Sequence, residues 1–188
     1  MRSFAPVTDD DLRRGRDVAT EVLAEKFDRL VSGPTGAFKD ALALLCLCQG
    51  SALHRVAAIR GVKDFDVWGF FRPISGQHFP VRARWEGDFG PSPHGRHPDD
   101  VEAGRSGRKV DVLGRDIPMG PNEDPRQAVR RYVAESRKGT PLEIAYRPVI
   151  VLWPDKWFGE TIWSLDDTVT KAPPAATQLL LPGEGRDS

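Results

Sequence analysis

Apolar residues recur along this chain at two spacings, one typical of helices and one typical of strands. Residues 8–31 carry apolar side chains at near-helical spacing, and Thr8 is placed to cap the first turn. Residues 125–138 form a second predicted helix, which Gly139 ends. A shorter helix is predicted over residues 51–59.

Short apolar runs with the character of strands separate these helices. Residues 41–48 are continuously apolar, which fits a helix or a central strand, and the Gly50-Ser51 turn that follows favours the strand. Residues 64–71 are aromatic-rich with period-two alternation. The other predicted strands cover residues 79–87, 109–114, 147–153 and 160–165. This order predicts an α+β fold, a mixed β-sheet with helices packed mainly on one side.

The remaining segments bound the domain. Residues 87–108 are dense in glycine, proline and charge, which predicts a long loop. The length of 188 residues fits one domain, predicted over residues 1–171. Residues 172–188 are predicted to be a flexible C-terminal tail.

Composition narrows the class of protein. Lysine and arginine together number 27, as do aspartate and glutamate, which argues against a histone-like protein but not against a local basic groove. No apolar run approaches the roughly 20 residues that span a bilayer, and the first residues lack an apolar signal core. We therefore expect a cytoplasmic protein with no membrane association. Abundant arginine, alanine, glycine and proline suggest a bacterial genome rich in G and C.

The two cysteines, Cys46 and Cys48, lie two residues apart in the apolar run 41–48. A strand points both to the same face. Without a second pair or a nearby histidine, they predict buried, reduced side chains rather than a metal site.

Two aspartates interrupt the aromatic run 64–71. A strand places Asp64 and Asp66 on the face opposite Phe65 and Val67, about 7 Å apart. Asp111 repeats the pattern in the later strand "KVDVLG". If the two strands are neighbours, three carboxylates meet in one patch, a set of ligands suited to Mg²⁺ or Mn²⁺. The alternative is an ordinary solvated face.

Gly50-Ser51 stands between the apolar run 41–48 and the predicted helix that follows. Glycine allows close approach of a ligand and the first amides of a helix attract phosphate, although a lone Gly-Ser is also a common turn. Together with "DFDV" at 64–67 and "VDV" at 110–112, it resembles the DNA polymerase beta superfamily of nucleotidyltransferases. The resemblance covers residues 41–113, and the segment 87–108 has no counterpart in it.

The resemblance implies an enzyme that moves a nucleoside monophosphate from a nucleoside triphosphate to an acceptor hydroxyl, releasing pyrophosphate. It implies that Asp64 and Asp66 ligate Mg²⁺ or Mn²⁺ and that Asp111 completes the site that activates the acceptor. It also implies that Gly50 and Ser51 hold the β- and γ-phosphates. The expected acceptor is RNA, such as tRNA, or a partner protein, as in toxin–antitoxin systems.

Other side chains are candidates to bind the substrate. Lys109, on the face of Asp111, could reach a phosphate or form a salt bridge with an acid. Arg82 and Arg84, on one face of the strand 79–87, could meet triphosphate, nucleic acid or solvent. Trp68 could stack on a nucleobase, although most of the five tryptophans are expected to lie in the core. A basic stripe on the helix 125–138, either facing RNA or solvated, comprises Arg126, Arg130, Arg131, Arg137 and Lys138.

Two other functions fit the same residues. A non-catalytic nucleotide- or partner-binding module would keep the fold and bind nucleoside triphosphate without turnover. A phosphohydrolase or nuclease would use the same acids and release phosphate or cleaved RNA instead of a modified acceptor.

Overall fold

A computed structural model of the chain describes residues 1–30, 33, 35–80, 83–136, 139–164 and 166–167. The predicted tail, residues 172–188, lies outside them. The helices are α1 (Asp9–Arg29), α2 (Gln49–Ala57), α3 (Pro98–Glu102), α4 (Pro125–Glu135) and α5 (Gly139–Ala145). The strands are β1 (Leu42–Cys48), β2 (Phe65–Phe71), β3 (Arg84–Asp88), β4 (Lys109–Asp116), β5 (Val149–Trp153) and β6 (Thr161–Trp163).

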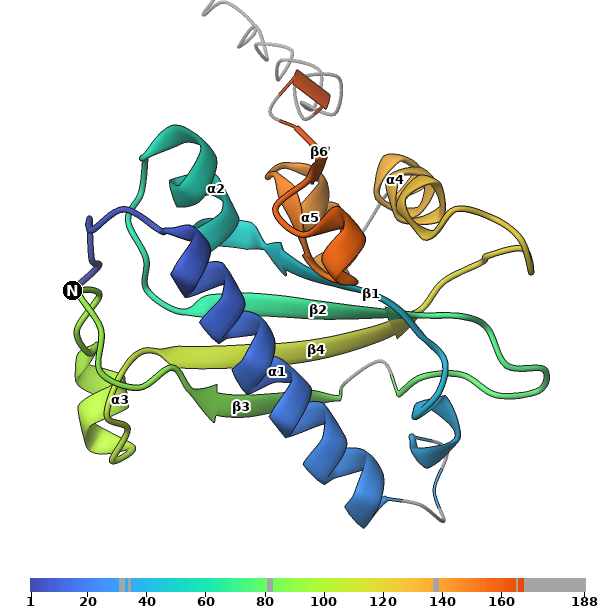
Figure 1. The fold of residues 1–188 in the computed structure, drawn as a ribbon, viewed down its shortest axis with the longest axis horizontal. Helices are drawn as coiled ribbons and strands as arrows, with labels where there is room; N and C mark the ends of the chain where they lie inside the picture. Colours follow the sequence, from blue (N-terminus) through green and yellow to red (C-terminus); the bar gives the residue numbers. More distant parts are fainter. Residues whose placement is uncertain (31–32, 34, 81–82, 137–138, 165, 168–188) are drawn as a thin grey trace, which may run out of the picture.

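The strands form one mixed sheet in the order β3-β4-β2-β1-β5-β6 (Figure 1). Strand β2 runs parallel to β4, while the other neighbouring pairs are antiparallel. The long connection between β2 and β4 carries β3 and α3, so β3 becomes the edge strand beside β4. The predicted α+β class with a mixed sheet is confirmed.

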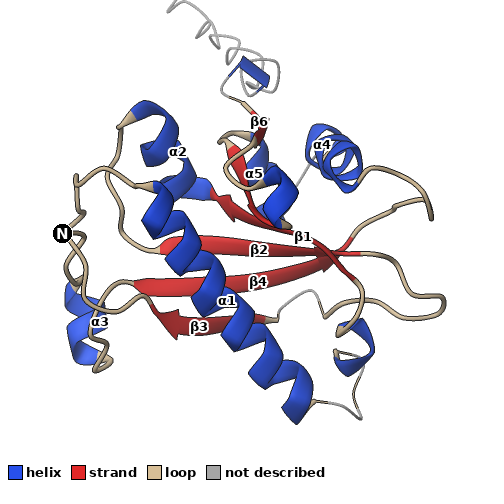
Figure 2. Ribbon diagram, viewed as in Figure 1, coloured by secondary structure: helices blue, strands red, loops and turns tan. Residues whose placement is uncertain are grey.

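Helices cover both faces of the sheet, so the prediction that they pack mainly on one side was wrong. Helix α1 lies across one face (Figure 2), where its apolar side chains join Leu45 and Leu47 of β1. On the opposite face, α4 and α5 pack against Leu44 and Cys46. The physical reason is the continuous apolar run of β1, which leaves apolar side chains on both of its faces to be covered.

Helix α1 begins where the sequence indicates. The Thr8 hydroxyl accepts a hydrogen bond from the Asp11 backbone, and the Asp11 carboxylate accepts one from Thr8 N, which forms a capping box. Its inward stripe includes Leu12, Leu23 and Phe27, all buried. Cap and stripe together fix where α1 begins and which face packs on the sheet.

Three elements differ from the sequence prediction. Strand β3 begins later than expected, at Arg84, and residues 81–82 lie outside the described residues. The predicted loop 87–108 contains α3, which His97 caps and Pro98 begins. A further helix, α5, follows α4 and had no periodic apolar stripe long enough to predict it.

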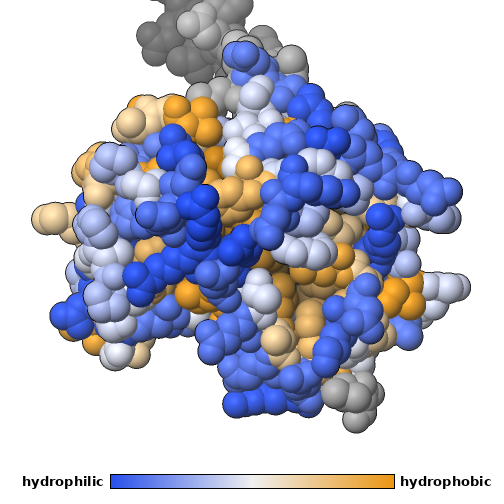
Figure 3. Space-filling view, in the orientation of Figure 1, coloured by the Kyte–Doolittle hydropathy of each residue, from blue (hydrophilic) through white to orange (hydrophobic). Residues whose placement is uncertain are grey.

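The face seen in Figure 3 is mostly hydrophilic, with apolar side chains gathered at the upper left over α2. Exposed apolar residues of this region include Phe4, Val56 and Ile59. Within the described ranges, no helix combines the length and the apolar character needed to cross a membrane.

Cys46 and Cys48 are buried free thiols, as predicted, and burial raises the pKa of both.

His94 is an unusual buried residue of the connection between β3 and β4. Its ring lies against the edges of Phe65 and Phe89, and neither ring nitrogen has a hydrogen-bond partner in the described structure. Nε2 lies 3.4 Å from Asp11 Oδ2. Desolvated polar nitrogens without partners cost folding free energy.

We expect His94→Phe to stabilise the protein by about 1–2 kcal/mol in urea unfolding at pH 8, because it removes two buried polar atoms from an aromatic cluster. His78→Phe, at an exposed position, is the control. A loss of stability specific to His94→Phe would instead mean that the contact with Asp11 is a stabilising one.

Candidate active site

The register of the sheet brings the predicted acids together. Strands β2 and β4 are parallel neighbours in which Asp66 is paired with Asp111. Side chains paired in this way point to the same face, and neighbouring strands lie about 4.8 Å apart. Asp64 directly precedes β2, and its charge acts on Asp66. The three carboxylates therefore form one group, which we call the acid cluster, at the first residues of β2 and β4.

Two members of the acid cluster are buried, so the alternative of a solvated face was wrong for Asp66 and Asp111, while Asp64 is half-buried. The Asp111 residue is fully buried and Asp66 is 7% exposed. Burial and the charges of Asp64 and Asp111 raise the pKa of Asp66 to about 8. No hydrogen bond or ion pair from the described residues reaches the Asp66 carboxylate. The site therefore holds an acid that is mostly protonated at neutral pH and that has no direct partner among the described residues.

Asp111 differs from Asp66 because two cations contact it directly. Arg84 donates to both carboxylate oxygens, with Nε 3.1 Å from Oδ1 and Nη2 on Oδ2. Lys109 Nζ lies 3.1 Å from Oδ2. The salt-bridge alternative for Lys109 is thus the arrangement found, and Arg84 shares its partner. The hydrogen bonds to Asp111 raise the pKa of Arg84.

The turn that carries Gly50-Ser51 lies beside the acid cluster. Cys48 pairs with Asp66 across β1 and β2, and α2 begins at the next residue. The first amides of a helix have no partner within the helix and point outward from its N-terminus. The Ser51 side chain, however, is buried and donates to Cys48 O at 3.2 Å. Because the whole Ser51 residue is buried, only the half-buried Gln49 and Gly50 of this turn are open to a ligand in this conformation.

Arg147 adds a positive charge on the same side as α2. Its guanidinium lies 3.4 Å from the Gln49 side-chain oxygen, and its charge lowers the pKa of Asp66 against the larger effects that raise it. The α2 turn and Arg147 therefore flank the acid cluster on the β1 side, while Arg84 and Lys109 flank it on the β3 side.

A cleft of about 260 Å³ opens beside the acid cluster. Helix α3 contributes one wall, so the segment 87–108 shapes the site in spite of its loop-like sequence. Salt bridges cross the cleft: Lys63 lies 3.6 Å from Asp99, and Arg105 pairs with Glu86. The cleft is lined by Lys63, Asp64, Glu86, His97, Asp99, Asp100, Ala103, Arg105 and Lys109.

One predicted contact with substrate, Trp68, is closed off by burial. Trp68 lies on the face of the acids, but it is fully buried beside Phe70 and below Arg115, so it presents no ring to a nucleobase. Arg82 lies outside the described residues. His54 has a structural role, because its two ring nitrogens lie within hydrogen-bonding distance of the backbone carbonyls of Ala5 and Ile59.

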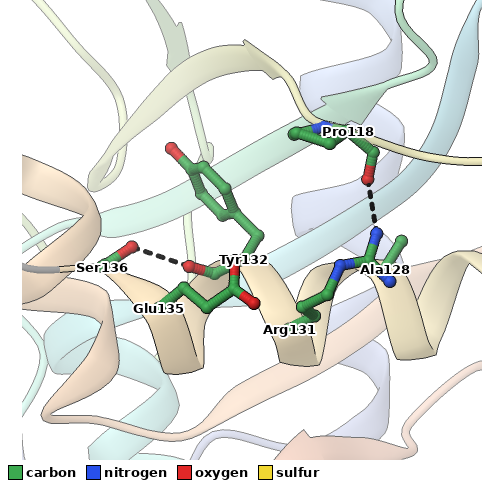
Figure 4. Close-up of a pocket in the computed structure, with 6 residues that line it drawn as sticks. All are labelled: Pro118, Ala128, Arg131, Tyr132, Glu135 and Ser136. Atoms are coloured by element: carbon green, nitrogen blue, oxygen red, sulfur yellow. Dashed lines mark hydrogen bonds between the residues drawn. The ribbon is translucent and has the colours of Figure 1, made fainter.

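The described arginines of the predicted basic stripe on α4 are bonded within the protein. Arg126 pairs with Asp124 and Glu160, and Arg130 with Asp167. Figure 4 shows Arg131 donating to Pro118 O at the edge of a small cavity of about 170 Å³. Arg137 and Lys138 lie outside the described residues. Paired arginines offer less free positive charge to a phosphate backbone.

Sequence reasoning missed three charged residues that the fold brings to the site: Glu86, Arg105 and Arg147. Glu86 is paired with Asp111 across β3 and β4, and Arg105 follows α3. Their only sequence signal was charge within short strands or loops, which is common on any surface. Only knowledge of the neighbouring strands could have selected them.

The acid cluster fits a divalent cation in its chemistry. It offers only carboxylate oxygens, which Mg²⁺ and Mn²⁺ prefer. The buried Asp66 carboxylate, without a hydrogen-bond partner among the described residues and next to two further acids, supports this fit. In the described positions, however, no three side chains of His, Cys, Asp or Glu converge closely enough to hold a metal. Asp111 would have to exchange its cationic partners for the ion.

Comparison with known proteins gives no independent support for a family. No protein-family model, curated protein or solved structure matches this chain.

Proposed function

We propose that this protein is a metal-dependent nucleotidyltransferase, which transfers a nucleoside monophosphate from a nucleoside triphosphate to an acceptor hydroxyl and releases pyrophosphate. The observation that carries the proposal is the pairing of Asp66 with Asp111 in adjacent parallel strands, both buried on one face. Asp64 and the first turn of α2 adjoin them. This grouping of acids and helix N-terminus is the one that the resemblance in residues 41–113 implies.

In this proposal Asp64, Asp66 and Asp111 hold Mg²⁺ or Mn²⁺, which would supply charge stabilisation for the transferred phosphoryl group. The turn at Gly50 and Ser51, with Arg147, binds the phosphates that leave as pyrophosphate. Asp111 orients the acceptor hydroxyl from the opposite side, since attacking and leaving oxygens lie in line. Lys109 and Arg84 balance the charge of the acids and phosphates. The proposed acceptor is either RNA or a protein.

The direct test is transfer of label from each α-labelled nucleoside triphosphate, with Mg²⁺ or Mn²⁺, to total cellular RNA and protein. We expect one labelled acceptor class, and a loss of roughly a thousandfold or more in Asp111→Asn, because that variant removes a carboxylate ligand. Glu21→Gln, on the exposed face of α1, serves as control and should keep full activity.

The possible outcomes separate the candidate functions. Thermal stabilisation by nucleoside triphosphate and Mg²⁺ with no label on any acceptor would favour a binding module. Released phosphate or cleaved RNA without transfer would favour a hydrolase. Undiminished transfer in Asp111→Asn would contradict the role proposed for Asp111.

A further inference from the structure

Arg84 occupies the position on Asp111 that a metal ion would need. Its guanidinium binds both carboxylate oxygens, and Lys109 lies against one of them. A carboxylate with both oxygens engaged by cations accepts a divalent ion only after one partner leaves. Asp111 is therefore closed to metal in this conformation, whereas Asp66 has no such partner among the described residues.

The two cations differ in how easily they can leave. Arg84 lies on the edge strand β3 and its side chain is 52% exposed, while the Lys109 side chain is 21% exposed and is also 3.7 Å from Glu86. A half-exposed arginine on an edge strand can rotate toward solvent without breaking the core. Of the two, Arg84 is the partner free to move.

A nucleotide gives Arg84 another partner. A guanidinium binds phosphate oxygens in the same forked geometry as a carboxylate, and it stays charged in both settings. The charges of Asp64 and Asp66 also act on Arg84. When Arg84 moves away, the acid cluster therefore loses a neighbouring positive charge. Such a cluster attracts a divalent cation more strongly.

We propose that Arg84 is a gate on the metal site, closing Asp111 until the phosphates of a nucleotide draw the guanidinium away. The inference rests on the proposed function and adds an order of binding to it. The metal ion alone binds weakly because Arg84 covers Asp111. Nucleotide and metal bind cooperatively, because the nucleotide draws Arg84 off Asp111 and the metal, once on Asp111, leaves Arg84 free for the phosphates. Arg84 is thus a regulatory residue of the site as well as a phosphate ligand.

The test is Mn²⁺ binding, followed by the paramagnetic resonance signal of the free ion, with and without a non-hydrolysable triphosphate analogue. We expect Arg84→Gln to bind Mn²⁺ alone on the order of tenfold more tightly than the unmodified protein, since one charge-assisted contact to Asp111 is gone. We also expect the analogue to increase Mn²⁺ affinity in the unmodified protein and to do so much less in Arg84→Gln.

Two further variants sharpen the result. Arg84→Lys keeps the charge but loses the fork, so an intermediate affinity is expected, and it substitutes if Arg84→Gln does not fold. Arg13→Gln removes an exposed arginine of α1 and should change nothing. Mn²⁺ affinity that is equal or weaker in Arg84→Gln, with the nucleotide effect intact, would overturn the gate but leave the proposed enzyme standing. No Mn²⁺ binding in any variant, with or without nucleotide, would overturn both.

Discussion

Asp66→Asn is expected to stabilise the folded protein at pH 8 while abolishing nucleotidyl transfer. Burial and two neighbouring acids raise the pKa of Asp66 from 3.8 to about 8. Between these values the folded protein keeps a proton that the unfolded chain has released. The contribution of the Asp66 proton to the free energy of unfolding is therefore complete below pH 4, and it is lost as the pH rises toward 8. Asparagine does not titrate, so the Asp66→Asn variant avoids this loss of stability, which is on the order of 5 kcal/mol at pH 8.

The measurement is the free energy of unfolding in urea from pH 5 to pH 8.5, for the unmodified protein and the variant. The difference between the two curves isolates the contribution of Asp66 from contributions that the two proteins share. It should grow steadily as the pH rises. Asp10→Asn, which changes an exposed acid of α1, is the control and should show no such trend. A pH-independent difference for Asp66→Asn would contradict the raised pKa.

The same variant separates stability from function. If Asp66 ligates a metal, Mg²⁺ should stabilise the unmodified protein more at pH 8.5 than at pH 6, because only the deprotonated carboxylate binds the ion. The asparagine variant should lose both this stabilisation and label transfer. A stabilised variant that still transfers label would show that the buried acid is not part of the chemistry.

Gly107→Ala is expected to destabilise the protein by at least about 3 kcal/mol, because the new methyl group would overlap backbone. A Cβ at this position would lie 2.6 Å from Gly90 N and closer still to the Gly90 carbonyl. The contact joins the two ends of the segment that carries α3. Asp88 closes the same junction by accepting hydrogen bonds from the amides of Gly90, Ser106 and Gly107, which lower its pKa to about 2.

Gly104→Ala gives a matched control in the same segment. Gly104 has a φ of +70° and no atom within 4 Å of an added Cβ, so the cost there is backbone strain of about 1 kcal/mol. Urea unfolding and the thermal midpoint measure both variants. If Gly107→Ala were no less stable than Gly104→Ala, the close packing of this junction would be refuted.

Local sequence predicted the type and the approximate position of most elements. The Thr8 cap and apolar stripe fixed α1, and the alternation around Asp66 and Asp111 fixed which face of each strand these acids occupy. Both signals arise from interactions within a few residues, so they can be read without knowing the fold. The same reasoning misjudged α3 and α5, which are short and lack a long apolar period.

The candidate site was only partly predictable. The three acids were found because aspartate is unusual inside an apolar strand. Of their cationic partners, Lys109 was predicted as a possible salt bridge to an acid, but the pairing of Arg84 with Asp111 was not, since an arginine on an alternating strand reads equally as solvent-facing. Arg147 and Glu86 gave no signal until the strands beside them were known.

The sequence by itself determined that Asp66 and Asp111 lie on strand faces opposite buried valines, because side chains alternate along any strand. Only the tertiary structure decided that β2 and β4 are parallel neighbours in register, that α4 and α5 cover part of the acidic face, and that Arg84 closes on Asp111. The alternation of side chains along a strand shows which face a residue occupies, but it does not show which strand lies beside it. Which strands adjoin depends on how the whole chain buries its apolar surface.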